Sequence, residues 1–144
     1  MPSPAGFLHH VEINVSDLER SRAFWGWLLP SLGYTTYQVW NEGVSYRLGG
    51  MYIVLVQTRR AHLAPVYDRR GTGLNHLAFH ARSRAYVDDL TALLEERGVP
   101  ILYPDRHPHA GGPDSYAVFF EDPDRIKVEV VAPDEEERLP ADRR

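Results

Sequence analysis

Two histidines and one glutamate occupy positions from which they could bind a single divalent metal ion. His10 and His76 each open a segment in which apolar and polar residues alternate, and Glu129 lies inside the apolar segment 126–131. Two neutral imidazole nitrogens and one carboxylate oxygen form a facial triad that leaves open positions for substrate oxygens. A metal ion held in this way acts as a Lewis acid. These three residues are therefore the predicted metal ligands.

The alternation predicts that the three ligands lie on sheet faces turned away from helices. Successive side chains of a strand point to opposite faces, so the apolar set packs on a helix and the other set points away. Three segments carry this pattern: 8–15, 74–81 and 126–131. Their outward sets, in chain order, are His10, Glu12 and Asn14; His76, Ala78 and His80; Lys127, Glu129 and Val131. The three ligands could converge if the sheets curl around a common cleft.

The order of expected elements is repeated in the two halves of the chain. Aligning His10 with His76 superposes, in each half, a strand, a serine and a helical stretch that ends at a glycine. Ser16 with Glu19 predicts a capping box and a helix from about Asp17, and Ser83 is predicted to cap the second helix. Further strands are expected at 34–40, 44–48 and 51–57, and again at 100–103, 115–121 and 126–131. Each half is thus predicted to be one strand, one helix and three strands.

The length of 144 residues suits one domain built from two small modules. We expect the first module at 7–57, a linker at 58–73, the second module at 74–132 and a charged tail at 133–144.

Composition excludes several classes of function. With 16 Lys and Arg against 20 Asp and Glu, the net charge of -4 argues against electrostatic binding to nucleic acid or to an anionic membrane. The absence of cysteine excludes disulfides, Cys-ligated zinc and thiolate nucleophiles. The apolar runs are far shorter than the roughly 20 residues of a membrane span, and the first residues do not resemble a secretion signal. A cytoplasmic location is therefore expected, with no nucleic-acid or membrane partner.

Three segments resemble the vicinal oxygen chelate superfamily, which includes glyoxalase I, fosfomycin-resistance proteins, extradiol dioxygenases and bleomycin-resistance proteins. They are "LHHVEINVSDLERSRAFW", "LNHLAFHA" and "YAVFFEDPDRIKVEVV", and the resemblance extends over about residues 7–132. It implies an α+β fold in which two βαβββ modules form a cupped mixed sheet around a central cleft, with the helices on the outer face. It also implies a homodimer.

The resemblance carries the family's metal ligands onto His10, His76 and Glu129, with Fe, Mn, Ni, Co or Zn as the divalent ion. His9 is the adjacent alternative to His10, although its parity directs it towards the helix.

The sequence departs from the family pattern at three positions, and these departures bear on which of the family's activities the protein could have. Arg125 replaces the glycine that usually follows "DPD", so this turn must differ or give Arg125 a use. Val54 or Leu55 stands where four-ligand glyoxalases carry another carboxylate, which weakens glyoxalase I proper. Glu12 stands where fosfomycin-type members carry a threonine, and a carboxylate there would repel a phosphonate.

Some further residues have both a functional and an ordinary interpretation. Glu12 could be a general base beside the metal, or a solvated strand carboxylate. His80 and Tyr116 could orient a polar substrate, or they could belong to ordinary packing. His107 and His109 lie in the loop at 105–114, which could be a lid or a simple solvated loop.

Two functions follow as expectations. The first is a metal-dependent glyoxalase-like lyase or isomerase, or a dioxygenase, acting on a small substrate that chelates the metal through adjacent oxygens. The alternative is a non-catalytic protein of the bleomycin-resistance type that sequesters an aromatic drug-like ligand. Trp40, Tyr46 and Tyr52 could line a pocket for such a flat ligand.

Overall fold

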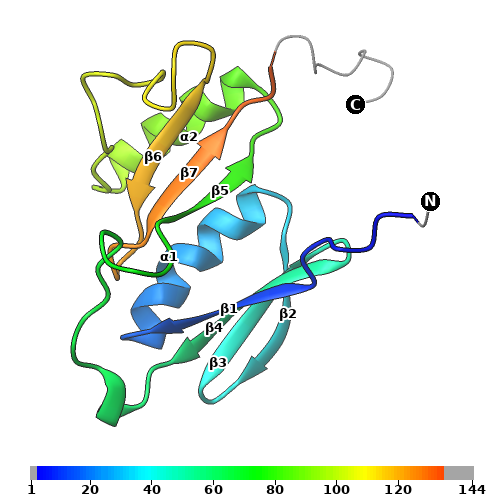
Figure 1. Cartoon of the computed structure of the whole chain (residues 1–144), viewed down its shortest axis with the longest axis vertical. Coiled ribbons are helices and arrows are strands. Elements are labelled where there is room, and N and C mark those ends of the chain that lie inside the picture. Colours follow the sequence, from blue (N-terminus) through cyan, green and yellow to red (C-terminus); the bar gives the residue numbers. More distant parts are fainter. Residues whose placement is uncertain (1–2, 135–144) are drawn as a thin grey trace. The chain divides into compact units, whose positions relative to one another are not determined.

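A computed structural model describes residues 3–134, which divide into two compact units at Val66 and Tyr67. Each unit contains one long helix and one sheet (Figure 1). The expected linker is split by this boundary, because a 3₁₀ turn at Arg60–His62 belongs to the first unit and residues from Tyr67 onward belong to the second. Over residues 3–134, no helix is both long enough and apolar enough to cross a membrane.

The first unit has a mixed sheet of four strands. These are β1 (His10–Val15), β2 (Thr35–Trp40), β3 (Gly43–Leu48) and β4 (Met51–Gln57), in the order β1-β4-β3-β2. β1 runs parallel to β4, and the other two pairings are antiparallel. The strands predicted in this half are therefore all present.

Helix α1 (Leu18–Ser31) follows β1 and covers one face of this sheet. Its N-cap is Asp17, whose side chain accepts a hydrogen bond from the Arg20 backbone at 3.1 Å. The N-cap predicted at Ser16 was therefore wrong by one residue. Aspartate is at least as good an N-cap as serine, and the Asp17 carboxylate accepts the hydrogen bond from a backbone N–H that has no partner within the helix. The buried side of α1 consists of Ser21, Phe24, Trp25, Leu28 and Leu29.

The second unit has a three-stranded mixed sheet and one helix. Its elements are β5 (His76–His80), α2 (Arg84–Glu96), β6 (Ala117–Glu121) and β7 (Lys127–Val131), and the sheet order is β5-β7-β6. β5 is parallel to β7, as β1 is to β4. Ser83 caps α2 as predicted, by accepting from the Tyr86 backbone at 3.0 Å. The α+β class with two βα-initiated modules is confirmed.

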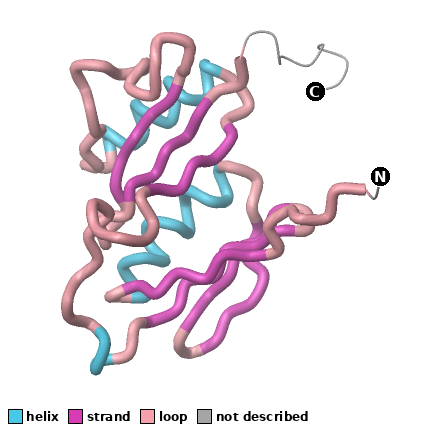
Figure 2. Tube along the Cα trace, viewed as in Figure 1, coloured by secondary structure: helices cyan, strands magenta, loops and turns pink. Residues whose placement is uncertain are grey.

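The strand predicted at 100–103 is wrong. Only Ile101 pairs, in an isolated antiparallel bridge with Phe120. Pro100 has no N–H to donate to a ladder, and Tyr103 turns the chain away with a left-handed φ of 54°. Residues 102–116 therefore form a long loop between α2 and β6, drawn in pink in Figure 2.

The predicted alternation of buried and outward side chains is present in both units. In β1, Ile13 and Val15 are buried whereas His10 and Glu12 are exposed. In β7, Val128 and Val130 are fully buried, and Glu129 between them is only half-buried. Each sheet thus has a helix-covered face and an opposite face, which we call the open face of that unit.

Candidate metal and substrate site

Two of the three predicted ligands lie together on the open face of the second unit. In the parallel pairing of β5 with β7, His76 is opposite Lys127, and Ala78 is opposite Glu129. Paired residues of a ladder project to the same side. His76 Nε2 consequently lies 3.4 Å from Glu129 Oε1, with side chains that are 33% and 15% exposed.

The residue that precedes His76 contacts one nitrogen of its ring. His76 Nδ1 lies 2.8 Å from Asn75 Oδ1. An amide oxygen can only accept a hydrogen bond, so a hydrogen bond at this contact needs the proton on Nδ1. In the neutral ring, Nε2 then keeps its lone pair, and this lone pair is on the side that faces the Glu129 carboxylate. Metal-ligating histidines commonly show this arrangement.

The spacing of this pair fits two ligands of one ion. Histidine nitrogen and carboxylate oxygen bind zinc-like ions at about 2.1 Å, which puts neighbouring ligand atoms about 3.0–3.4 Å apart for angles between about 90° and 110°. The distance of 3.4 Å between His76 Nε2 and Glu129 Oε1 is at the upper end of that range. Within residues 3–134, no three His, Cys, Asp or Glu side chains gather as a complete metal site. The second unit therefore brings two of the three predicted ligands together.

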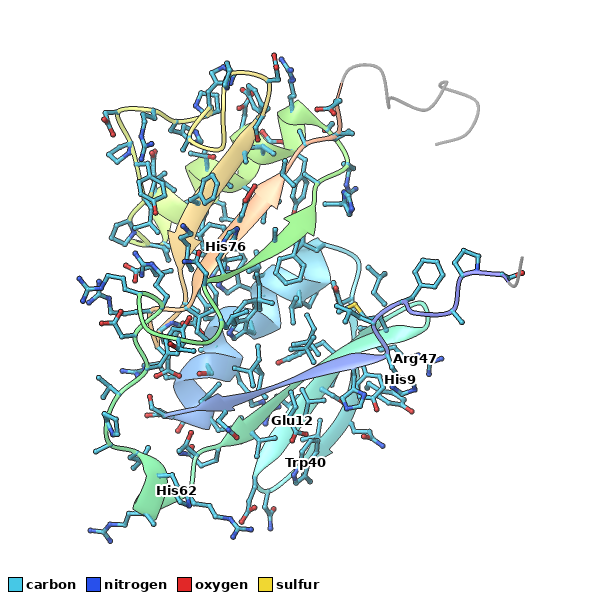
Figure 3. The ribbon with its side chains drawn as sticks, viewed as in Figure 1. His9, Glu12, Trp40, Arg47, His62 and His76 are labelled. Carbon is cyan, nitrogen blue, oxygen red and sulfur yellow. The ribbon has the colours of Figure 1, made fainter. Side chains whose placement is uncertain are left out.

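His10, the third predicted ligand, is held in an aromatic cluster on the open face of the first unit. Its ring stacks on Tyr52, its partner in the β1–β4 ladder, with ring centres 4.8 Å apart and planes 5° apart. His10 Nδ1 lies 2.9 Å from His9 Nδ1. Tyr52 also contacts Tyr37, and the Arg47 guanidinium lies over the Tyr37 ring. Figure 3 shows His9 and Arg47 at the end of the sheet where β1 begins.

The other predicted site residues have different surroundings. Glu12 is exposed on the open face of the first unit, two residues beyond His10 on the same strand. His80 lies on the open face of the second unit at the far end of β5, opposite Val131. Tyr116 is directed to the other side of that sheet, because its hydroxyl donates to Asp88 of α2 and Arg84 of α2 lies over its ring. The structure thus brings His80, but not Tyr116, to the face that carries His76.

Sequence reasoning missed a tyrosine–lysine pair on the same open face. Lys127 Nζ donates to the Tyr103 hydroxyl at 3.1 Å, and the Arg106 guanidinium lies 4.8 Å from the Tyr103 ring centre. The hydrogen bond from Lys127 lowers the pKa of Tyr103 below its ordinary value of about 10. Phe119 lies between this pair and the ligands, since its ring contacts the rings of both Tyr103 and His76. Lys127 stood at an outward position of 126–131, but nothing in the sequence pointed to Tyr103 as its partner.

Arg125 keeps the glycine-like conformation and also finds a partner. Its φ is 66°, the left-handed region that glycine adopts without strain. Its Nε donates to Glu121 Oε2 at 3.1 Å, and Arg69 also binds Glu121. Asp122, the first acid of "DPD", is buried and accepts from the backbones of Asp124 and Ile126. The hydrogen bonds to the Asp122 carboxylate therefore hold the turn before β7, although Arg125 stands at its glycine position.

The comparisons with known proteins agree with the fold and the motifs. The profile of the Glyoxalase/Bleomycin resistance protein/Dioxygenase superfamily matches residues 9–120. The chain is 56% identical over 126 residues to the uncharacterized protein YqjT of Bacillus subtilis, covering 88% of this chain and 98% of that one. It is 29% identical over 123 residues to the glutathione transferase FosA of Serratia marcescens, covering 85% and 78%.

A crystal structure of a glyoxalase candidate from Bacillus halodurans is 64% identical, with a TM-score of 0.88, and the match covers 89% of this chain and 96% of that one. The chain therefore belongs to the glyoxalase/bleomycin resistance protein/dioxygenase superfamily, the vicinal oxygen chelate group that its motifs resemble.

Proposed function

We propose that this protein is a divalent-metal-dependent enzyme whose substrate is a small molecule that chelates the metal through two adjacent oxygens. The proposed ligands are His10, His76 and Glu129, and the ion is Fe, Mn, Ni, Co or Zn. Glyoxalase-like lyase or isomerase chemistry is the first candidate, and ring-cleaving dioxygenation is the second. The observation that carries the proposal is the His76–Glu129 pair at 3.4 Å, with Asn75 on the far nitrogen of the ring.

The residues of the open faces suit such chemistry. The bound ion would supply Lewis acidity to a substrate oxygen. Glu12 could accept a proton from the substrate as a carboxylate general base, as expected from its place beside His10. Tyr103 is a second candidate for proton transfer, because Lys127 stabilises its deprotonated form. The distant relative named as a glutathione transferase supports group-transfer chemistry as well, although Glu12 disfavours a phosphonate substrate.

Metal analysis tests the first step. Purified protein reconstituted with Mn(II), Co(II), Ni(II) or Zn(II) should bind close to one ion per chain, measured by isothermal titration calorimetry and elemental analysis. His76→Ala should abolish stoichiometric binding, whereas His62→Ala, at an exposed histidine of the 3₁₀ turn, should not change it. Stoichiometric binding that survives His76→Ala would refute the ligand assignment.

A panel of reactions tests the second step. The metal-loaded protein is assayed with the hemithioacetal of methylglyoxal and glutathione, with fosfomycin plus glutathione, and with catechol under air. We expect turnover of the hemithioacetal, with catechol cleavage as the second outcome. Glu12→Gln should lower kcat by at least about 100-fold if Glu12 is the general base. Full turnover by this variant would exclude that role.

A binding function is the second candidate, and exposed aromatic rings of the first unit favour it. Tyr37 and Trp40 are 45% and 42% exposed, although aromatic rings of this size are usually more buried. Trp40 lies against Gly43, where an added Cβ would be 2.2 Å from the indole, so a residue larger than glycine would displace the ring. Quenching of Trp40 fluorescence by bleomycin in the presence of EDTA would support metal-independent sequestration. Its absence would leave the enzyme as the better proposal.

A further inference from the structure

The two predicted histidine ligands share a feature that does not follow from the metal chemistry alone. Each is the first residue of its strand, and in each case the residue just before it contacts the ring nitrogen Nδ1. Asn75 Oδ1 lies 2.8 Å from His76 Nδ1, and His9 Nδ1 lies 2.9 Å from His10 Nδ1. The arrangement thus occurs once in each unit, with different side chains.

We infer that Asn75 and His9 are positioning residues, each of which accepts a hydrogen bond from Nδ1–H of the following histidine and leaves Nε2 of that histidine for the metal. The inference rests on the proposed metal site, which it deepens. It assigns to His9 a role as the partner of His10, in place of the alternative ligand considered from the sequence. Partners of this kind typically change metal affinity by about 10- to 100-fold.

The position directly before a strand explains how a neighbouring side chain can reach the ring. Inside a strand, neighbouring side chains project to opposite faces, so they cannot meet. Asn75 and His9 lie outside β5 and β1, which begin at His76 and His10. The His9 carbonyl still accepts a hydrogen bond from the Tyr52 backbone at 3.2 Å, and the side chains of His9 and Asn75 nevertheless lie within hydrogen-bond distance of the histidine that follows each of them.

His76 has a contact at each of its two ring nitrogens. Free neutral imidazole can carry its proton on either nitrogen, and the hydrogen bond at one nitrogen decides which one is protonated. Asn75 offers an oxygen acceptor to Nδ1, and on the other side of the ring Nε2 faces the Glu129 oxygen at 3.4 Å. Two lone-pair-bearing atoms that face each other at this distance leave a place suited to a cation.

The hydrogen bond between His9 and His10 can run in either direction, whereas the orientation of the His10 ring is held by its neighbours. Since both atoms are Nδ1, one ring donates and the other accepts. The parallel contact of His10 with Tyr52 holds the plane of the His10 ring, and the contact with His9 sets which edge of the ring carries Nδ1. Donation by His10 leaves its Nε2 unprotonated, as in His76.

The test begins with tautomers in metal-free protein, so that it does not depend on metal binding. Long-range proton–nitrogen correlation spectra of ¹⁵N-histidine-labelled protein report which ring nitrogen is protonated, and they are recorded at about pH 8, above the ordinary pKa of a free histidine. We expect His10 and His76 as the Nδ1–H form. Asn75→Ala should convert His76 largely to the Nε2–H form, and His9→Ala should do the same to His10. A wild-type His76 with its proton on Nε2 would overturn the inference.

Two rescue variants separate positioning from a structural role. Asn75→Asp keeps an oxygen acceptor, and His9→Asn transfers the side chain of one unit into the other. Both should retain the Nδ1–H form, whereas Asn41→Ala, in the turn after β2, is a control that should change neither histidine.

Metal affinity completes the test. Calorimetry with Zn(II) should show a loss of about 10- to 100-fold for Asn75→Ala and for His9→Ala, with recovery in the two rescue variants. Unchanged affinity in Asn75→Ala, together with altered tautomers, would overturn the positioning role while leaving the metal site intact. Failure of the unaltered protein to bind any of the divalent ions would refute the proposed function, and the positioning role with it.

Discussion

The two units use the same scaffold but distribute their polar side chains differently. In each unit the first strand runs parallel to the last. Two pairs of this parallel ladder can be compared between the units: the pair that contains the histidine, and the pair two residues further along the strand. In the second unit these pairs are His76 with Lys127, and Ala78 with Glu129. In the first unit they are His10 with Tyr52, and Glu12 with Val54.

Both units have a histidine at the start of the first strand, but the residues around this histidine differ between the units. The carboxylate stands on the last strand in the second unit, as Glu129, and on the first strand in the first unit, as Glu12. Val54 therefore occupies the place that corresponds to Glu129, which answers the choice between Val54 and Leu55 left by the sequence. Across from the histidine, an aromatic ring in one unit replaces an ammonium in the other. One unit thus stacks its imidazole, and the other pairs it with an acid.

The largest expected effect separates the two carboxylates. Glu129→Gln removes the anionic oxygen 3.4 Å from His76 Nε2 and should weaken Zn(II) binding by more than about 100-fold, beyond the usual effect of an indirect partner. Glu12→Gln is the same isosteric change at the other position and should alter affinity by less than about 3-fold, because Glu12 is not a predicted ligand. Calorimetry measures both. Equal losses would mean that the two units are equivalent in metal binding.

A second prediction compares the cores. Leu29 of α1 and Leu94 of α2 are both fully buried, so Leu29→Ala and Leu94→Ala should each cost about 2–5 kcal/mol through lost transfer free energy and a residual cavity. All three tryptophans, Trp25, Trp27 and Trp40, belong to the first unit. Urea unfolding followed by fluorescence should therefore detect Leu29→Ala, and far-ultraviolet circular dichroism should detect Leu94→Ala. A cost below about 1 kcal/mol for either variant would contradict the burial.

The fold was predictable where one local signal acted alone. The period-two pattern at 8–15 and the serine before α2 gave the right elements, since burial on one face and an N-cap act over a few residues. The segment 100–103 failed because its apolar residues fit a strand, whereas Pro100 and the left-handed Tyr103 limit pairing to Ile101. Side-chain pattern alone does not report backbone conformation.

The alternation of side chains along the strands predicted which face each candidate site residue occupies. It did not predict which of these residues are in contact. Alternation put His76 and Glu129 on one kind of face, but only the ladder register brings them to 3.4 Å. Tyr116 was expected at the substrate, yet its parity with Val118 turns it towards α2, where its hydroxyl donates a hydrogen bond to Asp88. Asn75 and Tyr103 were not singled out, because a residue before a strand and a residue in a long loop carry no periodic signal.

A smaller effect distinguishes the turns that lead into the last strand of each unit. Gly49 in the first unit and Arg125 in the second both have left-handed backbones, with φ of 57° and 66°. Gly49→Ala should cost about 1 kcal/mol from the backbone alone, since an added Cβ meets no atom within 4 Å.

At the second turn, Arg125→Gly should be more stable than Arg125→Ala by about 1 kcal/mol, because both variants lose the bond to Glu121 and only glycine relieves the strain. Urea denaturation measures both differences. Equal stability of the two Arg125 variants would show that this turn adapts when the arginine side chain is removed.

The smallest effect concerns two tyrosines, one in each unit, whose pKa values are shifted in opposite directions from the ordinary value. In the first unit, burial raises the pKa of Tyr34. In the second, the hydrogen bond from Lys127 lowers the pKa of Tyr103. Ultraviolet difference titration should therefore lose its earliest ionisation in Tyr103→Phe and a late one in Tyr34→Phe, and Lys127→Met should move the early ionisation upwards.

The sign of the accompanying stability change follows from linkage. A phenol whose folded pKa lies below its unfolded value favours the folded state once it ionises, so stability contributed by Tyr103 should appear as pH rises through its folded pKa and approach its full value above about 10. It should disappear as pH falls back through that pKa. Tyr34 should act in the opposite direction, because its folded pKa is raised and the unfolded chain ionises first. Unfolding measured between about pH 8 and 10 should show the Tyr103→Phe variant losing stability relative to the unaltered protein as pH rises. A constant difference over that range would mean that Lys127 holds Tyr103 without favouring its phenolate.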